Sequence, residues 1–351
     1  MDGKKQGEFT YIKNLIEKLQ RTGRDVIAGA GDDAGVIRFG DQYLLATTDA
    51  LVEGVHFISE VFRPEDVGRK AIAVNVSDIA AMGGKPLYCL VSLVLPKRIG
   101  ENYRTRLYDG IIEECKRYDI QIIGGNISGG KELVVDIFLL GSVSPDKMIL
   151  RSGARVGDKV LVTGSLGEAA AGFQLLQNFR FKSLVELDSR LRGNDREKSG
   201  NDKGGSLISR QLTPKPRLKE GLVIAESGFA TSMIDISDGL GQDIGHICDS
   251  SGVGVKIYEE KLPIGDGVRE VAGKIGKSAW ELALSGGEDY ELCFTVSGEF
   301  VEKVKSTIEE KTGTRVSVVG EILPKDEGQV FVLKNGEIVP LPSSGWDHFG
   351  N

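Results

Sequence analysis

Apolar positions in the first 150 residues fall into two kinds of segment. Short runs rich in branched residues, such as YLLATT at 43–48 and LYCLVSLVL at 87–95, are typical of buried strands. Between such runs, apolar residues recur at helical spacing over about 9–21, 64–82 and 101–118. The alternation of the two patterns predicts an α/β unit.

A second series of the same kind begins with GDKVLVTGSLGEAAAGFQLL at 157–176, a pattern that predicts a strand, a glycine turn and a helix. The runs VGVKIY, ELCFTV, RVSVVG and QVFVL follow, with helical segments between them. The 351 residues also exceed the length at which a single core usually stops growing, about 250–300 residues. We therefore expect two domains, 1–148 and 149–351, joined near 144–158.

One segment interrupts the second series. Between Asp188 and Lys203, nine of sixteen residues are charged and Leu191 is the one strongly apolar residue. Such a composition buries too little surface to offset the entropy lost on ordering. We predict a disordered insertion at about 184–205.

Composition and charge narrow the function. The chain is 40% hydrophobic and 27% charged, as in ordinary globular proteins, and its net charge of -7 disfavours nucleic acid as a partner. Its longest apolar run is too short to cross a membrane, and its first residues carry charges throughout, so we expect a cytoplasmic protein. The four cysteines lie far apart, which favours buried thiols over a zinc site or disulfides.

Acidic residues gather at the predicted turns and strand ends. Asp32 and Asp33 follow a GAG turn, and Asp49 ends the strand YLLATTD. Any one of them could be an ordinary turn or cap residue. Asp78 is different, because it lies in the middle of a helix that is apolar nearly all round, where a carboxylate needs a partner, a proton or a metal.

A second pair of acids, Asp235 and Asp238, flanks Ser237 where an apolar run enters a glycine turn. Carboxylates that converge on one site repel each other unless a cation neutralises them. Oxygen ligands without neighbouring His or Cys favour Mg²⁺ over zinc. The acidic positions therefore predict a magnesium site.

Glycine-rich turns such as GAGDDAG, GGNISGG and DGLGQDIG provide backbone N–H groups that can hold phosphate oxygens. None fits the P-loop pattern or the dinucleotide fingerprint. The three histidines are widely spaced, so no histidine triad or metal site is predicted. His56 lies close to Asp49 and could contact a substrate or be a satisfied structural histidine.

Taken together, GDDAG, TTDALVEGVHF, KAIAVNVSDIAAMGG, RSGARVGDKVLVTGSLGEAAAG, IDISDGLGQDIGHI, SGGEDYEL and GWDHF resemble the thiamine-monophosphate kinase family. This family belongs to an ATP-binding superfamily that includes aminoimidazole ribonucleotide synthetase and selenophosphate synthetase. The motifs occur in order along nearly the whole chain, apart from the charged insertion. TTDALVEGVHF and SGGEDYEL are specific to the kinase branch.

The resemblance implies transfer of the ATP γ-phosphoryl group to thiamine monophosphate, with ATP as co-substrate and several Mg²⁺ ions. It implies a two-domain synthetase-like fold, α/β (α+β), whose N-terminal domain binds ATP and Mg²⁺ and forms a β-barrel with the same domain of a second copy, giving a homodimer. No catalytic side chain is expected beyond positioning and metal catalysis, since a phosphate nucleophile is already deprotonated.

The matching motif positions carry the family's roles over to this chain. The metal ligands implied are Asp32, Thr47, Thr48, Asp49, Asp78, Asn126, Asp235 and Asp238. The residues implied to contact ATP are Tyr108, Gly125, Asn126, Arg151 and Ser237. The residues implied to contact thiamine monophosphate are His56, Glu288 and Trp346.

Two positions depart from the family pattern. Many members have GGDTTR where this chain has GGNISG, so Asn126 replaces an acidic ligand and Gly129 an arginine. An asparagine carbonyl can coordinate Mg²⁺ but brings no charge. These changes leave open a regulatory protein that binds nucleotide without turnover.

A synthetase of the same superfamily is the alternative enzyme. The first cysteine, Cys89, lies inside a predicted strand and the chain ends WDHFGN, so the reactive N-terminal cysteine of selenophosphate synthetases and the terminal cysteine of the hydrogenase-maturation relatives have no counterpart. A protein whose acids are all caps and turn residues is also disfavoured, because that reading does not account for Asp78.

Overall fold

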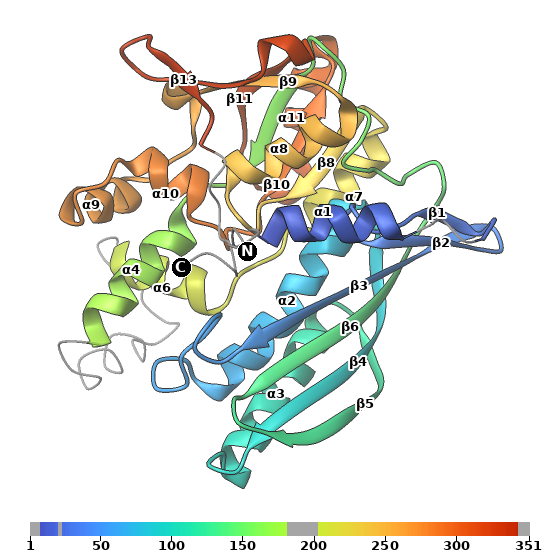
Figure 1. Cartoon of the computed structure of the whole chain (residues 1–351), viewed down its shortest axis with the longest axis vertical. Helices are drawn as coiled ribbons and strands as arrows, with labels where there is room; N and C mark the ends of the chain where they lie inside the picture. The colour runs from blue at the N-terminus through green and yellow to red at the C-terminus, as the bar shows by residue number, and fades with distance from the viewer. Residues whose placement is uncertain (1–7, 20–22, 181–202, 343–351) are drawn as a thin grey trace, which may run out of the picture.

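The structure is a computed structural model that describes residues 8–19, 23–180 and 203–342 (Figure 1). The predicted disordered insertion falls almost entirely outside these residues, and so does Trp346. In the part of the chain that is described, no helix is both long and apolar enough to span a membrane.

The first sheet has the strand order β1-β2-β3-β6-β4-β5. Neighbouring strands are antiparallel except β4 and β5, which pair in parallel through the crossover helix α3. The bounds are β1 Val26–Ala28, β2 Gly35–Phe39, β3 Gln42–Val52, β4 Lys85–Pro96, β5 Gln121–Gly130 and β6 Val134–Val143. The long strands agree with the predicted branched runs.

Helices α2 (Pro64–Ala81) and α3 (Glu101–Arg117) cover one face of this sheet (Figure 1). Two glycines let them approach closely, because a Cβ at Gly68 would lie 2.2 Å from the Leu107 carbonyl and one at Gly110 would lie 2.2 Å from the Glu65 carbonyl. The opposite face leaves large apolar side chains exposed. They are Ile37, Phe39, Tyr88 and Leu90.

The second sheet has the order β13-β12-β9-β11-β7-β10-β8, in which only β12 and β9 are parallel neighbours. Its central strands β7 and β10 are buried on both faces, which explains their continuous apolar runs. The bounds are β7 Lys159–Thr163, β8 Ala230–Asp235, β9 Gly254–Tyr258, β10 Leu292–Val296, β11 Val316–Leu323, β12 Gln329–Val332 and β13 Ile338–Pro340.

Helices cover both faces of the second sheet. The apolar side chains of α7 (Leu218–Ser227) and α11 (Val301–Thr312) form one core with Leu161, Met233 and Phe294, while α8 (Leu240–Ser251) and α10 (Ala279–Ser285) form another with the side chains on the opposite face. The remaining described elements are α1 Glu8–Lys18, α4 Glu168–Arg180, α6 Lys203–Leu212, α9 Asp266–Lys274 and the 3-10 turns Glu259–Lys261, Gly298–Phe300 and Lys325–Glu327.

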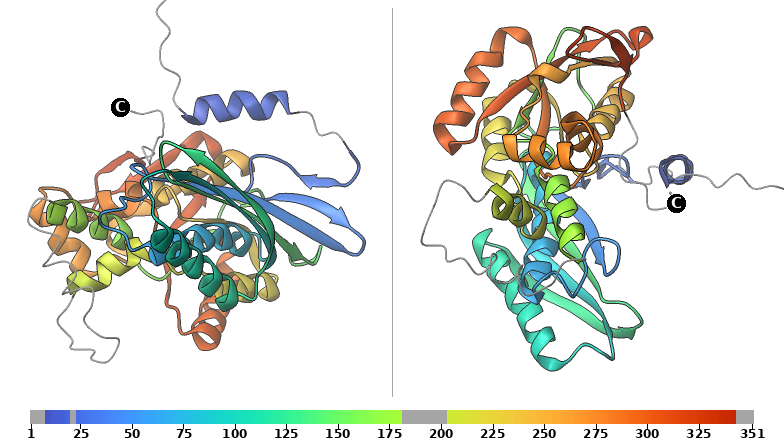
Figure 2. Two further views of the ribbon diagram at one scale, coloured as in Figure 1. Left: turned by 90° about the horizontal axis from the view of Figure 1, so that it is seen from below. Right: turned by 90° about the vertical axis from the view of Figure 1, so that its left-hand side faces the viewer.

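Helix α2 joins the two halves of the molecule. It contacts α7, α6 and β8 of the second half as well as the first sheet, and the two halves lie one above the other in the right-hand view of Figure 2. A Cβ at Gly221 of α7 would lie 2.3 Å from the Ala80 carbonyl, so this crossing is also close. The two-domain mixed α/β fold is confirmed. The described residues of this single chain form two open sheets and no closed barrel.

Candidate active site

A cavity of about 470 Å³ lies where α2 and β3 meet the second domain. Its wall includes the end of β3 and the turn that follows, the middle of α2, the start of α8 and the loop 286–290. Residues far apart in sequence therefore share one cavity. Ten of the predicted site residues line it: Thr47, Thr48, Asp49, His56, Asp78, Arg151, Asp235, Ser237, Asp238 and Glu288.

Three carboxylates form the centre of the cavity wall. Asp33, Asp78 and Asp235 each offer an oxygen, and these oxygens all lie within 4.8 Å of one another. They come from the turn before β2, the last turn of α2 and the end of β8, so Asp78 lies nearer the end of its helix than the sequence pattern predicted. Thr47 donates a hydrogen bond of 2.5 Å to Asp78, and Ser77 donates one of 2.6 Å to Asp235.

Three polar side chains in the C-terminal half of α2 are used at this site. Asn75 accepts a hydrogen bond of 3.0 Å from the Asp49 backbone N–H and donates to the Ala71 carbonyl. Ser77 and Asp78 reach Asp235 and Thr47 as described above. From Ala71 to Ala81 the helix is otherwise apolar and buried, so the polar positions of this part serve the cavity.

Desolvation and mutual repulsion favour the protonated forms of these acids. Burial, followed by the charge of Asp33, raises the pKa of Asp235 to about 8. Burial also raises the pKa of Asp33, and it raises that of Asp78 well above its usual value together with the charges of Asp49, Asp235 and Asp33. Asp49 is exposed on the cavity side, and desolvation, followed by the charge of Asp238, raises its pKa to about 6.

The neighbouring acids Asp32 and Asp33 have different surroundings. Asp32 accepts hydrogen bonds from the backbone N–H groups of Arg151 and Asp33. Asp33 Oδ1 accepts from the Arg151 guanidinium at 2.5 Å and 3.1 Å, whereas its buried Oδ2 accepts no hydrogen bond from the described residues. The motif match assigned a metal to Asp32, but the structure brings Asp33 to the other carboxylates. The sequence alone cannot rank two adjacent acids in a turn, because Arg151, which separates their roles, lies over 100 residues away.

The start of α8 adds a second acidic group. Asp243, buried within the first turn, accepts hydrogen bonds from the N–H groups of Gly239 and Asp238, and Gln242 donates to Asp238. Burial raises the pKa of Asp243 well above its usual value. On the same helix, burial lowers the pKa of His246 to about 4, so this histidine is neutral at physiological pH.

The loop 286–291 directs four consecutive side chains to four different places. Glu288 and Tyr290 have φ values of 60° and 49°, in the left-handed region that non-glycine residues rarely adopt. Glu288 pairs with Lys70, and Asp289 accepts from the N–H groups of Gly167 and Ala169 at the start of α4. Tyr290 lines the cavity, and Glu291 pairs with Arg217.

Sequence reasoning did not single out Lys70, Tyr290 or Arg217. Lys70 follows Arg69 on α2, and Arg217 lies between two lysines just before α7; such basic residues ordinarily predict a solvated face, yet Lys70 is fully buried. Glu288 lies 218 residues from Lys70 and Glu291 lies 74 residues from Arg217, so no local pattern indicates these two ion pairs.

Four predicted site residues are not at the cavity. Tyr108 packs on the first core from α3, and Gly125 and Asn126 lie on the exposed edge strand β5. Asn126 is separated from Ala50 at the cavity by two intervening strands, through Ser92 and Asp136, a span of about 14 Å at ordinary strand spacing. Asp32 lies beside the cavity at Arg151, and Trp346 is outside the described residues.

The cavity lining is strongly acidic. Among the described residues that line the cavity, seven are acids and Arg151 is the one Lys or Arg. The acids are Asp33, Asp49, Asp78, Asp235, Asp238, Asp243 and Glu288. An anionic ligand could enter such a cavity only together with cations. The unpartnered Asp33 Oδ2, surrounded by hard oxygen donors, fits a Mg²⁺ ion.

Comparison with known proteins places the chain in a sequence family. The family models "AIR synthase related protein, N-terminal domain" and "AIR synthase related protein, C-terminal domain" match residues 31–143 and 155–333. Thiamine-monophosphate kinase of Escherichia coli K12 is 36% identical over 344 residues, which are 98% of both chains. That of Aquifex aeolicus is 35% identical over 347 residues, 99% of both. The solved structure of AaThiL complexed with AMPPCP and TMP has a TM-score of 0.79 at 34% identity and covers 99% of both chains.

Proposed function

The chain belongs to the thiamine-monophosphate kinase family, and from this premise we propose that it transfers the γ-phosphoryl group of ATP directly to the phosphate of thiamine monophosphate on a magnesium site. The relatives of this name match nearly the full length of the chain, and the structure with AMPPCP and TMP has the same fold. The enzyme is therefore a phosphotransferase.

The acidic excess of the cavity is the observation that carries the mechanism. ATP and thiamine monophosphate are both anions, yet their proposed site carries seven acids against one arginine. Repulsion would prevent binding unless cations lie between the carboxylates and the phosphates. The surplus of carboxylates thus supports a metal template rather than a site that binds phosphate by arginines.

We assign the central Mg²⁺ site to Asp33, Asp78 and Asp235, whose oxygens already lie within 4.8 Å of one another. Thr47, Thr48, Asp49 and Asp238 line the same cavity and extend the ligand set. Bound Mg²⁺ would neutralise and align the phosphates and stabilise the charge that develops during transfer. Asp33 takes the place that the motif match gave to Asp32, since Asp32 is engaged by two backbone N–H groups.

The protein's own groups position the two substrates. Arg151 and Ser237 lie at the acidic centre and would contact ATP, whereas His56 and Glu288 line the part of the cavity assigned to thiamine monophosphate. An oxygen of the acceptor phosphate attacks the γ-phosphorus, the bond to the β-phosphate oxygen breaks, and ADP leaves. The acceptor oxygen is already ionised, so no general base is required.

The direct test incubates the purified protein with ATP, MgCl₂ and thiamine monophosphate and follows the products by ³¹P NMR, omitting each component in turn. Thiamine diphosphate and ADP should form together and only in the complete mixture. ADP and free phosphate without thiamine diphosphate would indicate the synthetase alternative. Binding of ATP without its consumption would indicate the regulatory alternative.

Removal of Mg²⁺ should affect stability in a pH-dependent way. Burial raises the pKa of Asp235 from 3.8 to about 8 and that of Asp289 from 3.8 to about 7, so between about pH 4 and these values the folded protein holds protons that the unfolded chain has released. Metal-free stability should therefore fall as the pH rises from about 6.5 to about 8.5. His246 has the opposite effect on stability, but only below about pH 6.5, because its pKa is lowered from 6.5 to about 4.

Mg²⁺ competes with protons for the carboxylates, so its stabilising effect should grow over the same range. The increase in Tm on adding MgCl₂ is expected to be larger at about pH 8.5 than at about pH 6.5, measured by differential scanning fluorimetry against EDTA. An equal increase at both pH values would contradict the assignment of the carboxylates to the metal.

A homodimer is the proposed assembly. The face of the first sheet that α2 and α3 leave open carries Phe39, 75% exposed, and Tyr88, 41% exposed, and the long strand β5 is an unpaired edge. A second copy packed there would cover both features and complete a barrel. In such a dimer, Gly125 and Asn126 of one copy could reach the cavity of the other copy.

Light scattering should accordingly give a mass of about twice the 37.9 kDa chain. Tyr88→Glu, which places a charge on the open face, should shift the mass toward that of one chain. A single-chain mass for the unaltered protein would rule out the dimer. The four described cysteines are free and buried, which supports the further proposal that the protein acts in the reducing cytoplasm.

A further inference from the structure

Lys70 lies beneath the cavity. Its side chain is fully buried on α2, and its ammonium nitrogen lies 2.7 Å from Glu288 Oε1. Two longer contacts, 3.5 Å and 3.4 Å, join it to the carbonyl oxygens of His56 and Gln211. The ring of Phe62 lies 5.6 Å from the same nitrogen. A buried ammonium group is stable only with such partners.

The three polar partners of Lys70 all line the cavity, although Lys70 itself does not. They come from three separate segments: His56 from the turn after β3, Gln211 from the end of α6 and Glu288 from the loop 286–291. Lys70 of the first domain thus joins two segments of the second domain, at Gln211 and Glu288, to the turn after β3 in the first domain.

Glu288 is held at both carboxylate oxygens. Oε1 pairs with Lys70, and Oε2 accepts a hydrogen bond from the amide nitrogen of Gln211. Its backbone N–H donates to the Ser237 carbonyl at 2.7 Å, and its φ of 60° is fixed by the loop. The side chain remains 26% exposed, so the carboxylate presents its free lone pairs to the cavity in one orientation.

We propose that Lys70 is a positioning residue for the acceptor end of the cavity, which holds Glu288, His56 and Gln211 in the arrangement that receives thiamine monophosphate. This inference rests on the proposed function, because it takes the surroundings of Glu288 as the acceptor site. Lys70 touches neither the acidic centre nor Arg151, so the ATP end should not depend on it.

Steady-state kinetics of Lys70→Met test this separation. The KM for thiamine monophosphate should rise about 10- to 100-fold, because a small displacement of binding groups has effects of this size. The KM for ATP should be unchanged. A general loss of structure would instead alter both constants or the fraction of active enzyme.

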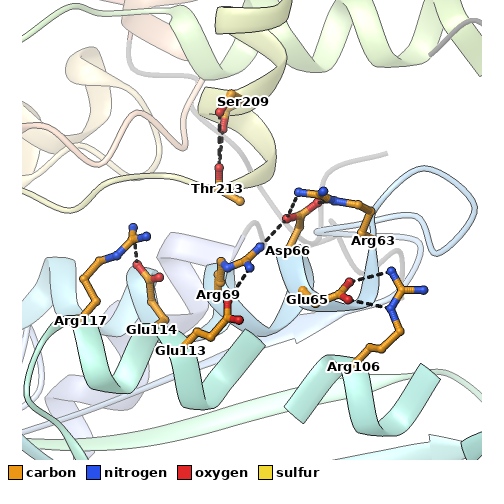
Figure 3. A network of polar contacts seen from close by, with 10 residues as sticks. All are labelled: Arg63, Glu65, Asp66, Arg69, Arg106, Glu113, Glu114, Arg117, Ser209 and Thr213. Atoms are coloured by element: carbon orange, nitrogen blue, oxygen red, sulfur yellow. Dashed lines mark hydrogen bonds and ion pairs between the residues drawn. The ribbon is translucent and has the colours of Figure 1, made fainter. Parts of the chain in front are cut away.

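Arg69→Met is the matched control. Arg69 is the preceding residue on α2 and has the same charge, but it pairs with Asp66 at 3.0 Å and with Glu113 at 2.5 Å on the outer side of the helix pair (Figure 3). None of these residues lines the cavity. Both KM values should stay at the level of the unaltered enzyme.

Glu288→Gln and the double variant Lys70→Met/Glu288→Gln complete a double-mutant cycle with Lys70→Met. If Lys70 acts through Glu288, the double variant should have nearly the same KM for thiamine monophosphate as Glu288→Gln alone. The double variant removes the buried charge of Lys70 together with that of its partner Glu288, so it should fold even if Lys70→Met does not. The KM for thiamine monophosphate of the double variant, compared with that of Glu288→Gln, then still shows whether Lys70 acts through Glu288.

The proposal is overturned if Lys70→Met leaves the KM for thiamine monophosphate unchanged, or if its effect multiplies fully with that of Glu288→Gln. These results would leave the kinase activity of the unaltered protein intact. Failure of the unaltered protein to form thiamine diphosphate would instead overturn the proposed function.

Discussion

Asp33→Asn is expected to lower kcat by about 10²- to 10³-fold, the usual effect of removing one charge-stabilising group from a preorganised site. Asp33 shares the carboxylate cluster with Asp78 and Asp235, and its buried Oδ2 has no hydrogen-bond partner among the described residues. The change keeps the shape of the side chain and removes one negative charge. The measurement is kcat at saturating ATP and thiamine monophosphate over a range of MgCl₂ concentrations.

Asp32→Asn is the control, because the two changes are chemically identical and adjacent. Asp32 accepts hydrogen bonds from the N–H groups of Arg151 and Asp33, and an asparagine carbonyl can still accept them. Its effect on kcat should be at least about tenfold smaller than that of Asp33→Asn. A larger loss of kcat for Asp32→Asn than for Asp33→Asn would indicate that Asp32, the residue given by the motif match, is the metal ligand.

Arg217→Met is expected to lower the free energy of unfolding of the second domain by about 3–5 kcal/mol, because it leaves a buried carboxylate without its cation. Arg217 donates to both oxygens of Glu291, at 2.5 Å and 2.6 Å, and Glu291 is 1% exposed. Thr163 donates to the same carboxylate. Urea unfolding followed by circular dichroism measures the change.

Two further variants identify the cause. Arg106→Met breaks a two-pronged pair with Glu65 at the surface of α2 and α3 (Figure 3), where ion pairs contribute about 0–1 kcal/mol. Arg217→Met/Glu291→Gln should recover much of the stability lost in the single variant, since the unpaired charge is gone. Equal losses for Arg106→Met and Arg217→Met would contradict the role of burial.

The ion pair of Arg217 and Glu291 also stabilises the loop that carries Glu288. Glu291 follows Glu288 by three residues in a loop with two left-handed non-glycine residues, Glu288 and Tyr290. Such backbone conformations persist only where surrounding contacts enforce them. Anchors at Asp289 and Glu291 thus help to hold Glu288 in the cavity.

The helices and strands were largely predictable from the sequence. Helix α2 was expected over 64–82 and spans Pro64–Ala81, and α3 was expected over 101–118 and spans Glu101–Arg117. Their apolar spacing is strong and local, so it survives in the fold. Short edge strands such as β1 and β13 were not predicted, because three residues carry too little pattern.

The site was predictable where a residue contradicts its local context. Asp78 interrupts an apolar helix, and the structure places it in the carboxylate cluster. The position of Asp33, rather than Asp32, beside Asp78 and Asp235 and the burial of Lys70 depend on Arg151 and Glu288, which only the tertiary fold brings near. Likewise, the motif does not indicate that Asn126 lies on an edge strand far from the cavity; this follows only from the strand order.

Crystals of the protein grown with MnCl₂ and a non-hydrolysable ATP analogue give the most direct test of the carboxylate cluster as a metal template. Mn²⁺ prefers the same oxygen ligands as Mg²⁺ and scatters anomalously. An anomalous peak is expected in direct contact with Asp33, Asp78 and Asp235 and with the phosphates of the analogue. Phosphates bound in the cavity with no peak at these three carboxylates would contradict the proposed mechanism.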